Sequence, residues 1–312
     1  MEIRLAGDTW VSGLALDSSI KSVGSPLESD YASVLFVIPA GCKIFLEAGA
    51  RLLALSNQLA FCSKEVTIDF SDCQEMLTYF DRIGFFDHLD ANVIVKPSRP
   101  LFSRALIYKG NNDSVYEFGE IDPNHLDEDI PQRLKQSFVH YAGDNYSQPA
   151  FTVLSELFGN VRDHSESPIH GYIALQHYKG HGGRRAVAPH IQTIVSDSGK
   201  GIIGTLLPVL EKRRPDIFRK FDFSDPVSKP MLVKEVLLKG RISQSTDKGR
   251  GLGLKRSADV AADYNATISV REDTFELRLL YKNGKFSSSS YELDLPKMMG
   301  CHICFDFILA TS

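Results

Sequence analysis

Three short segments decide the fold of the second half of this chain: Glu156-Leu157-Phe158-Gly159-Asn160, Asp197-Ser198-Gly199-Lys200-Gly201 and Gly249-Arg250-Gly251-Leu252-Gly253-Leu254. The first has a carboxylate and an amide four residues apart, which share one face if the segment is helical. The second opens a glycine turn with an aspartate, and the third is a glycine-rich loop that leads into a helix. One short glycine pattern is a weak signal, but three such segments in this order predict one composite nucleotide pocket.

The elements around these segments predict the architecture of residues 136–312. A helix is expected over 147–165 with Ser147 as its N-cap, and its apolar face consists of Phe151, Leu154, Phe158 and Val161. Further along the chain, hydrophobic periodicity predicts strands over 171–178, 191–196, 266–271, 274–281 and 300–309, and helices over 203–220, 231–240 and about 254–264. Helices in one group beside mixed, largely antiparallel strands predict an α/β sandwich.

Two runs of cysteine and histidine need separate interpretation. Cys301-His302-Ile303-Cys304 has the residue types of a metal site, but no second Cys/His pair stands at a zinc-site distance in the sequence. It continues as Phe305-Asp306-Phe307, which predicts a strand with alternate side chains on opposite faces. The run from His177 to Arg185 is rich in glycine and charge and lies between two apolar segments, which predicts a hairpin tip. Neither run predicts a metal centre.

The first third of the chain alternates short apolar segments of two kinds. We expect strands over 33–38, 66–70, 93–95 and 106–108, and helices over 49–59 and 73–89. This alternation predicts an α/β layer with at least one parallel strand pair. Residues 111–135 are polar, acidic and interrupted by prolines, which predicts a connector. We therefore expect a domain over 1–110 and a second domain over 136–312.

Bulk properties exclude several classes of protein. A length of 312 residues suits two domains, and 43% hydrophobic with 24% charged residues is typical of a soluble globular protein. The net charge of −4 gives no basic surplus for nucleic acid, and no run of about 18 apolar residues predicts a membrane span. The start of the chain lacks a secretion signal, and an odd number of cysteines, five, fits a reducing compartment. The expected location is the cytoplasm.

The three segments resemble the N, G1 and G2 boxes of the GHKL (Bergerat-fold) ATPases and kinases, which include DNA gyrase and the histidine kinases. The likeness is nearest to the anti-sigma-factor serine kinases, where residues 155–164 match the same helix. The resemblance covers about residues 135–310 and implies ATP and Mg²⁺ as cofactors. The first domain resembles a STAS domain, the antagonist module of partner switching. Ser71 is the nearest stand-in for the phosphorylated serine of that module, and a helix N-cap shared with Asp72 is the favoured alternative.

The GHKL resemblance also implies roles for individual residues. Asn160 is expected to ligate the Mg²⁺ that bridges the phosphates, and Glu156 to act as general base. The resemblance extends the expected ATP-binding set to Asp163, His164, Asp197, Gly199, Gly201, Ile202, Lys248, Gly249, Arg250, Gly251, Leu252, Gly253 and Leu254. Within it, Asp197 is expected to accept a hydrogen bond from adenine, and the amides of 249–254 to bind phosphates.

The same resemblance assigns residues 203–248 to an ATP lid, in keeping with the tendency of long insertions to act as lids or binding loops. Arg241, Lys248 and Arg250 are candidates to neutralise the γ-phosphate, or else solvated surface charges. Members of the family often carry a threonine on the last strand beside adenine, whereas this chain has Cys301 after Gly300. A histidine-kinase dimerisation hairpin is not visible in the sequence.

Two functions are left open by the sequence. The chain is expected to hydrolyse ATP or to transfer its γ-phosphate to a protein Ser/Thr, with lid closure coupled to a regulatory protein partner. The alternative is a non-catalytic, ATP-gated binding switch in a partner-switching system. An intact Glu156 favours the first, because a binding module has no need of a base. The sequence leaves a homodimer open and indicates neither a nucleic-acid nor a membrane partner.

Overall fold

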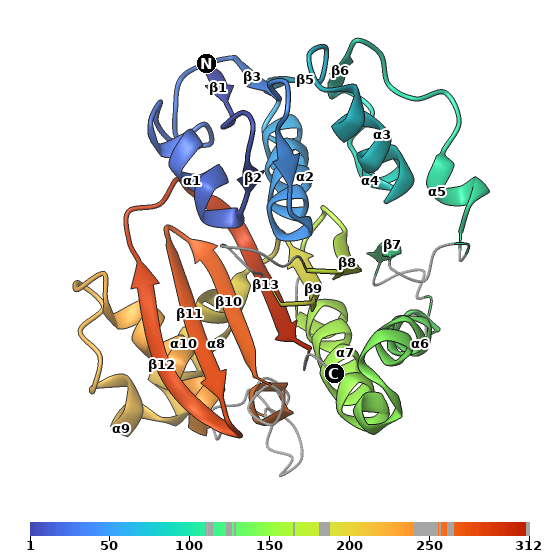
Figure 1. The fold of residues 1–312 in the computed structure, drawn as a ribbon. Coiled ribbons are helices and arrows are strands. Elements are labelled where there is room, and N and C mark those ends of the chain that lie inside the picture. The colour runs from blue at the N-terminus through green and yellow to red at the C-terminus, as the bar shows by residue number, and fades with distance from the viewer. Residues whose placement is uncertain are drawn as a thin grey trace.

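The computed structural model describes residues 1–109, 111, 115–122, 127, 129–164, 166–180, 188–239, 255, 257–260 and 265–309. In this part of the chain a seven-stranded antiparallel sheet lies at the centre, and helices pack against both of its faces (Figure 1). None of the helices in these ranges combines the length and the apolar character that a bilayer crossing needs.

The central sheet confirms the expected strands of the second half. Its strands are β7 (Val115–Ile121), β8 (Gly171–Tyr178), β9 (His190–Asp197), β10 (Ala266–Asp273), β11 (Phe275–Lys282), β12 (Lys285–Glu292) and β13 (Met298–Ile308). They pair antiparallel in the order β12-β11-β10-β13-β9-β8-β7. Five of these strands match the predicted ranges within two residues at each end. The sequence analysis missed β12, whose mostly exposed serine run gives no alternating apolar signal.

The strand β7 corrects the prediction of a connector over 111–135. It pairs with β8 at the edge of the sheet, with Tyr116 packed into the core on one face and Phe118 into the core on the other. The helix α6 (Ile130–Ala142) also begins inside the predicted connector. The prolines and acidic residues that flank these elements hid a short apolar segment that is buried from both sides.

One face of the central sheet is covered by α6 and by α7 (Ser147–His164), α8 (Gly201–Arg213), α9 (Pro215–Phe218) and α10 (Ser228–Lys239), with a short 3-10 helix, η1 (Asp144–Tyr146), before α7. Ser147 is not the predicted N-cap, because η1 runs directly into α7 and Ser147 has helical backbone angles (φ −57°, ψ −52°). The predicted helix itself is confirmed, and it buries Leu154, Phe158 and Val161 as expected.

Residues 1–109, the N-terminal unit, contain a four-stranded parallel sheet of order β1-β3-β5-β6, which confirms the expected α/β layer. Its elements are β1 (Glu2–Arg4), β2 (Trp10–Val11), α1 (Gly13–Lys21), β3 (Ser33–Val37), β4 (Lys43–Ile44), α2 (Leu46–Phe61), β5 (Glu65–Asp69), α3 (Gln74–Arg82), α4 (Phe85–His88), β6 (Ile94–Lys96) and α5 (Arg104–Ile107).

Two predictions for the N-terminal unit are wrong. The helix expected over 73–89 is divided into α3 and α4 at Gly84, whose φ of 80° lies in the left-handed region that interrupts a helix. The strand expected over 106–108 is part of the helix α5. Ser103 caps this helix by accepting a hydrogen bond from the Leu106 amide at 3.1 Å, a local bond that apolar patterning does not reveal.

The helix α2 joins the N-terminal unit to the central sheet. Every residue from 46 to 59 is buried, because α2 contacts β5 on one side and β8, β9 and β13 on the other. A single apolar cluster runs from the N-terminal unit into the central sheet, where it includes Tyr172, Ile194 and Cys304. The boundary predicted near residue 110 therefore separates two sheets but does not separate two cores.

Candidate functional site

The helix α7 presents the polar side chains of the expected N box next to its buried face. Glu156 and Asn160 are half-buried, whereas the neighbouring Leu157 and Val161 are buried in the core. The Nδ2 atom of Asn160 and the Oγ atom of Ser155 are buried and have no hydrogen-bond partner among the described residues. Buried polar atoms without a protein partner are costly, so this part of α7 is suited to contact a polar ligand.

The expected N and G1 boxes meet at Gly171, the first residue of β8. A Cβ atom at this position would lie 2.5 Å from Cγ1 of Val161 and 3.7 Å from Cβ of Asp197. A glycine is therefore required here, because any larger residue would push α7 away from the end of β9. Asp197 is the last residue of β9 and is buried, and its Oδ1 accepts a hydrogen bond from the Gly199 amide at 2.6 Å. Two segments separated in the sequence thus form one wall.

A row of three side chains crosses the sheet at Asp197. Asp197 is paired with Cys301 on β13, and Cys301 with Glu272 on β10, so these three residues point to the face that carries α8. We call Asp197, Cys301 and Glu272 the front row. Burial, together with the charges of Glu272 and Asp197, raises the pKa of the Cys301 thiol. Cys301 thus occupies the position beside Asp197 that the sequence analysis compared with a threonine.

Glu272 is a residue of this region that sequence analysis missed. Its carboxylate accepts hydrogen bonds from the Ile202 amide at 3.1 Å and the Ile203 amide at 2.8 Å, at the N-terminus of α8. Gly201 has φ of 68°, and a Cβ there would lie 2.4 Å from Oε1 of Glu272. The absence of a side chain at Gly201 therefore leaves space for the side chain of Glu272. Burial raises the pKa of Glu272 to about 8, and the nearby charge of Asp197 contributes.

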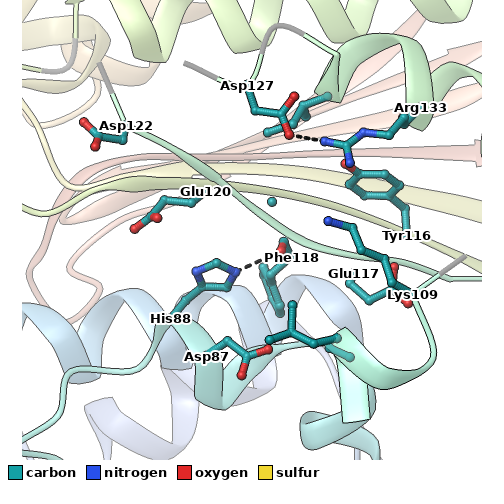
Figure 2. A pocket seen from close by; sticks show the side chains of 14 residues that line it. Asp87, His88, Lys109, Tyr116, Glu117, Phe118, Glu120, Asp122, Asp127 and Arg133 are labelled. Carbon is teal, nitrogen blue, oxygen red and sulfur yellow. Dashed lines mark hydrogen bonds and ion pairs between the residues drawn. The ribbon is translucent and has the colours of Figure 1, made fainter. Parts of the chain in front are cut away.

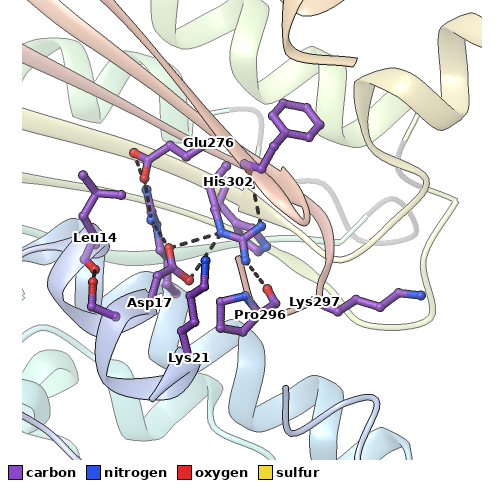
Figure 3. Close-up of polar contacts among 12 residues, drawn as sticks. Leu14, Asp17, Lys21, Glu276, Pro296, Lys297 and His302 are labelled. Carbon is purple, nitrogen blue, oxygen red and sulfur yellow. Dashed lines mark hydrogen bonds and ion pairs between the residues drawn. The ribbon is translucent and has the colours of Figure 1, made fainter. Parts of the chain in front are cut away.

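On the opposite face of the central sheet, the neighbouring row of paired residues belongs to a buried ion network (Figure 3). Ser196, His302 and Arg271, the back row, are paired across β9, β13 and β10. Arg271 lies 3.2 Å from Asp17 of α1 and donates to the carbonyls of Asp273 and Pro296. Burial, helped by Arg51 and Arg271, lowers the pKa of His302 to about 3. The back row thus contacts the N-terminal unit through the ion pair of Arg271 with Asp17.

Arg51 of α2 is the centre of this ion network. Its guanidinium lies 2.6 Å from Glu47, 2.8 Å from Asp17 and 3.1 Å from Glu276 of β11. The Arg51 side chain is about 1% exposed, and its three carboxylate partners come from three elements and also pair with Arg271 and Arg278. Sequence analysis contained no signal for this cluster, because its members come from helices and strands that are far apart along the chain.

Other residues of the expected site lie elsewhere or outside the described part of the chain. Asp163 is exposed and forms an ion pair with Arg162 at 2.6 Å, at the surface end of α7. The His164 side chain and residues 240–254 lie outside the described residues, so no position can be given for Arg241 or for the expected phosphate-binding loop with Lys248. The roles proposed for these residues stay predictions.

The described part of the expected lid is packed into the core. Residues 203–239 form most of α8 together with α9 and α10, and Leu206, Leu210, Leu232 and Val236 are buried against the central sheet. The prediction of a lid over 203–248 is wrong for this part, because helices with buried apolar faces cannot open without exposing the core. A lid over 240–248 stays a prediction outside the described residues.

A cavity of about 260 Å³ lies apart from this region, between α4 and α5 on one side and β7 and α6 on the other (Figure 2). Its polar lining includes Asp87, Glu117, Glu120 and Asp127. These carboxylates already have protein partners, such as Arg133 for Asp127 and His170 for Glu120. Residues of the expected nucleotide site do not line this cavity. Among the described residues, no group of three His, Cys, Asp or Glu side chains is arranged to hold a metal ion.

The serine considered in the STAS resemblance lies in a turn after β5. The Ser71 amide donates to Oδ1 of Asp69 at 2.9 Å, and a hydrogen bond from the Ser71 side chain lowers the pKa of Asp69. The following helix begins at Gln74 with Cys73 in the N-cap position, so the N-cap expected from Ser71 and Asp72 is wrong. A phosphorylation site at Ser71 stays a prediction.

The strand expected over the cysteine and histidine run is confirmed. In β13, Cys301 and Ile303 pack on the face that carries α8, whereas Cys304 packs on the face that carries α2, as strand alternation requires. All five cysteines are free. Comparisons of the chain with family models, with curated proteins and with solved structures gave no match.

Proposed function

We propose that α7 and the turn after β9 form part of an Mg²⁺-dependent ATP site of the GHKL type, in a regulatory protein that hydrolyses ATP or transfers its γ-phosphate to a protein Ser/Thr. The observation that carries this proposal is the convergence of the two segments at Gly171. It sets the helix that bears Glu156 and Asn160 against the strand end that bears Asp197.

The side chains at this wall suit the proposed roles. Asp197 supplies a buried carboxylate, an acceptor that fits the exocyclic amine of adenine. Glu156 lies one helical turn before Asn160, so a base and a phosphate-side ligand project from one stripe of α7. A carboxylate in this position can align and deprotonate a water molecule or a protein hydroxyl that lies within hydrogen-bond reach.

The fit of Mg²⁺ depends on Asn160. The Nδ2 atom of Asn160 is buried without a hydrogen-bond partner among the described residues, and rotation of the amide would exchange this nitrogen with the oxygen. Mg²⁺ is commonly held by one or two protein oxygens together with phosphate oxygens and water, so one amide oxygen can serve as the protein ligand. When bound, the ion would neutralise charge on the phosphates.

A regulatory role is supported by the packing of the N-terminal unit. Its helix α2 shares a core with the strands that end at the proposed site, so a partner that binds residues 1–109 can influence nucleotide binding. The same packing supports the second candidate function, a non-catalytic switch in which ATP binding alone changes a partner surface. The two candidates differ only in turnover.

The test is incubation of the purified chain with ATP labelled on its γ-phosphate, with and without Mg²⁺, and with and without cell extract. Released labelled phosphate supports hydrolysis, and label on a second protein supports phosphotransfer. Nucleotide binding by calorimetry without either product supports the binding switch. The proposal as a whole is refuted if the chain binds neither ATP nor ADP in the presence of Mg²⁺.

A further inference from the structure

The N-terminal unit contacts the expected G1 turn directly through one side chain of α2, Gln58. The Gln58 Nε2 atom donates to Oγ of Ser198 at 2.9 Å and to the carbonyl of Met299 at 2.9 Å, and its Oε1 accepts from the Met299 amide at 2.9 Å. Gln58 is completely buried. Its amide therefore joins the turn that follows Asp197 to the backbone that enters β13.

The two backbone segments that Gln58 joins are themselves in close contact. Met299 and Gly300 form a bulge, because Met298 pairs with Asp273 whereas Cys301 pairs with the preceding Glu272. Gly300 has φ of 80°, and a Cβ there would lie 2.0 Å from the carbonyl oxygen of Asp197. The bulge is thus in close contact with Asp197, the residue expected to recognise adenine. Gln58 hydrogen-bonds to both the bulge and the turn and holds them in position relative to each other.

We propose that Gln58 is a positioning residue through which the N-terminal unit sets the geometry of the turn 197–201 and thereby the affinity of the nucleotide site. A displacement of α2 would move Ser198 and Met299 together, because all three hydrogen bonds of the Gln58 amide go to these two residues. The effect on nucleotide affinity rests on the proposed function. The effect on the turn rests on the hydrogen bonds alone.

The neighbouring residue Asn57 provides a matched control. Its amide also makes three hydrogen bonds, to the carbonyl of His88, to the hydroxyl of Tyr172 and from the amide of Asp90, at 2.8–2.9 Å. Asn57 is buried on the same helix, but its hydrogen bonds go to neither the turn 197–201 nor the bulge at Met299. Gln58→Ala and Asn57→Ala therefore remove comparable bonds, whereas only the first removes the link to the proposed site.

The experiment measures hydrogen exchange of residues 197–203 without nucleotide and the affinity for Mg²⁺–ATP in the same proteins. Gln58→Ala should speed exchange in 197–203 and weaken ATP binding about tenfold, within the usual range of coupling between sites. Asn57→Ala should lower thermal stability about as much as Gln58→Ala does. It should leave the exchange of residues 197–203 and the affinity for ATP unchanged. Ser198→Ala should weaken ATP binding less in the Gln58→Ala protein than in the wild type. In the Gln58→Ala protein the hydrogen-bond partner of Ser198 is already absent.

Gln58→Met is the second variant, because it keeps the volume of the side chain and removes its hydrogen bonds, so a folded protein is available if Gln58→Ala unfolds. Unchanged exchange in 197–203 in the folded Gln58 variant overturns the inference. So does an ATP affinity equal to that of Asn57→Ala. If the wild type binds no nucleotide, the proposed function and the affinity effect fail, whereas faster exchange in the Gln58 variants still supports the positioning of the turn.

Discussion

Two adjacent rows of paired residues in the central sheet point to opposite faces and differ in the partners of their buried charges. The front row of Asp197, Cys301 and Glu272 carries two carboxyl groups and a thiol next to the N-terminus of α8. The back row of Ser196, His302 and Arg271 joins a network in which Arg51 and Arg271 are matched by carboxylates of α1, α2 and β11. The back row thus contacts the N-terminal unit, whereas the front row contacts the turn after β9 and the N-terminus of α8.

This difference predicts that contacts on the back face stabilise the fold and that side chains of the front row and α7 serve the proposed function. A buried ion pair adds little beyond a well-packed apolar core, but removing one partner leaves a charge buried alone and is strongly destabilising. Loss of a charge from the back-face ion network should therefore lower the stability of the fold strongly. Loss of a front-row or α7 side chain should change ligand binding or turnover and leave the fold intact. Four predictions test this contrast, from the largest expected effect to the smallest.

Glu156→Ala should reduce turnover about 10²–10⁴-fold, the usual contribution of a positioned base, and should leave ATP affinity nearly unchanged. The measurement is phosphate release and ATP binding in the same preparation. Asn160→Ala should reduce both, since it removes the expected Mg²⁺ ligand from the ground state and the transition state. Thr152→Ala is the control, because Thr152 lies one turn before Glu156 on α7 and bonds to the Gln148 carbonyl. Equal turnover in wild type and Glu156→Ala favours the binding switch.

Arg51→Met should lower the free energy of unfolding by about 3–5 kcal/mol, because Asp17, Glu47 and Glu276 stay buried without this cation. Urea denaturation followed by circular dichroism measures the loss. Lys239→Met is the control, since it removes an exposed ion pair with Glu235 and should change the midpoint little. A midpoint for Arg51→Met equal to that of the control would contradict the role of the back-face network.

Asp197→Asn should weaken ATP binding by about 1.5–3 kcal/mol, the value of a hydrogen bond to a charged group, without lowering thermal stability to the extent of Arg51→Met. Asparagine keeps the shape of the side chain and can still accept the hydrogen bond from Gly199. Calorimetry with ATP and GTP measures the change. Equal affinity of the wild type for ATP and GTP would contradict the role of Asp197 in adenine recognition.

Stability should fall as pH rises from about 4.5 to about 8, because the raised pKa of Glu272 means that the folded state holds a proton which the unfolded chain has already released. The slope for one proton cannot exceed about 1.4 kcal/mol per pH unit. The slope is measured from thermal midpoints across this pH range, compared between wild type and Glu272→Gln. Glutamine cannot ionise, so the variant should lose this component of the slope. An identical pH profile in both proteins would contradict the effect of burial on Glu272.

Much of the fold followed from local patterns in the sequence. The strands at 171–178 and 191–196 and the helix at 147–165 were predicted nearly to the residue, because each has a continuous apolar period on at least one face. The parallel layer of the first third followed from the alternation of strands and helices. The misses have local causes: β7 lies between polar flanks, α5 depends on the cap at Ser103, and β12 is a mostly exposed serine run.

Less of the candidate site could be predicted. The sequence supplied Glu156, Asn160 and Asp197, and the structure brings their segments together at Gly171. Glu272 and Gln58 could not be found in the same way, because an acidic residue in a strand and an amide in a helix have no motif around them. The nucleotide, the partner and the cytoplasmic location stay predictions.

By itself, the sequence determined most of the segments that become helices or strands and the residue types at their ends, because those properties depend on neighbours within a few positions. Only the tertiary structure decided the register that sets Cys301 between Asp197 and Glu272, the packing of α2 between two sheets, and the contact of Gln58 with Ser198. Register and packing depend on pairings between residues far apart along the chain, such as Gln58 and Met299, which are 241 positions apart. No local pattern encodes such a pairing, and it is fixed when the apolar faces are buried together.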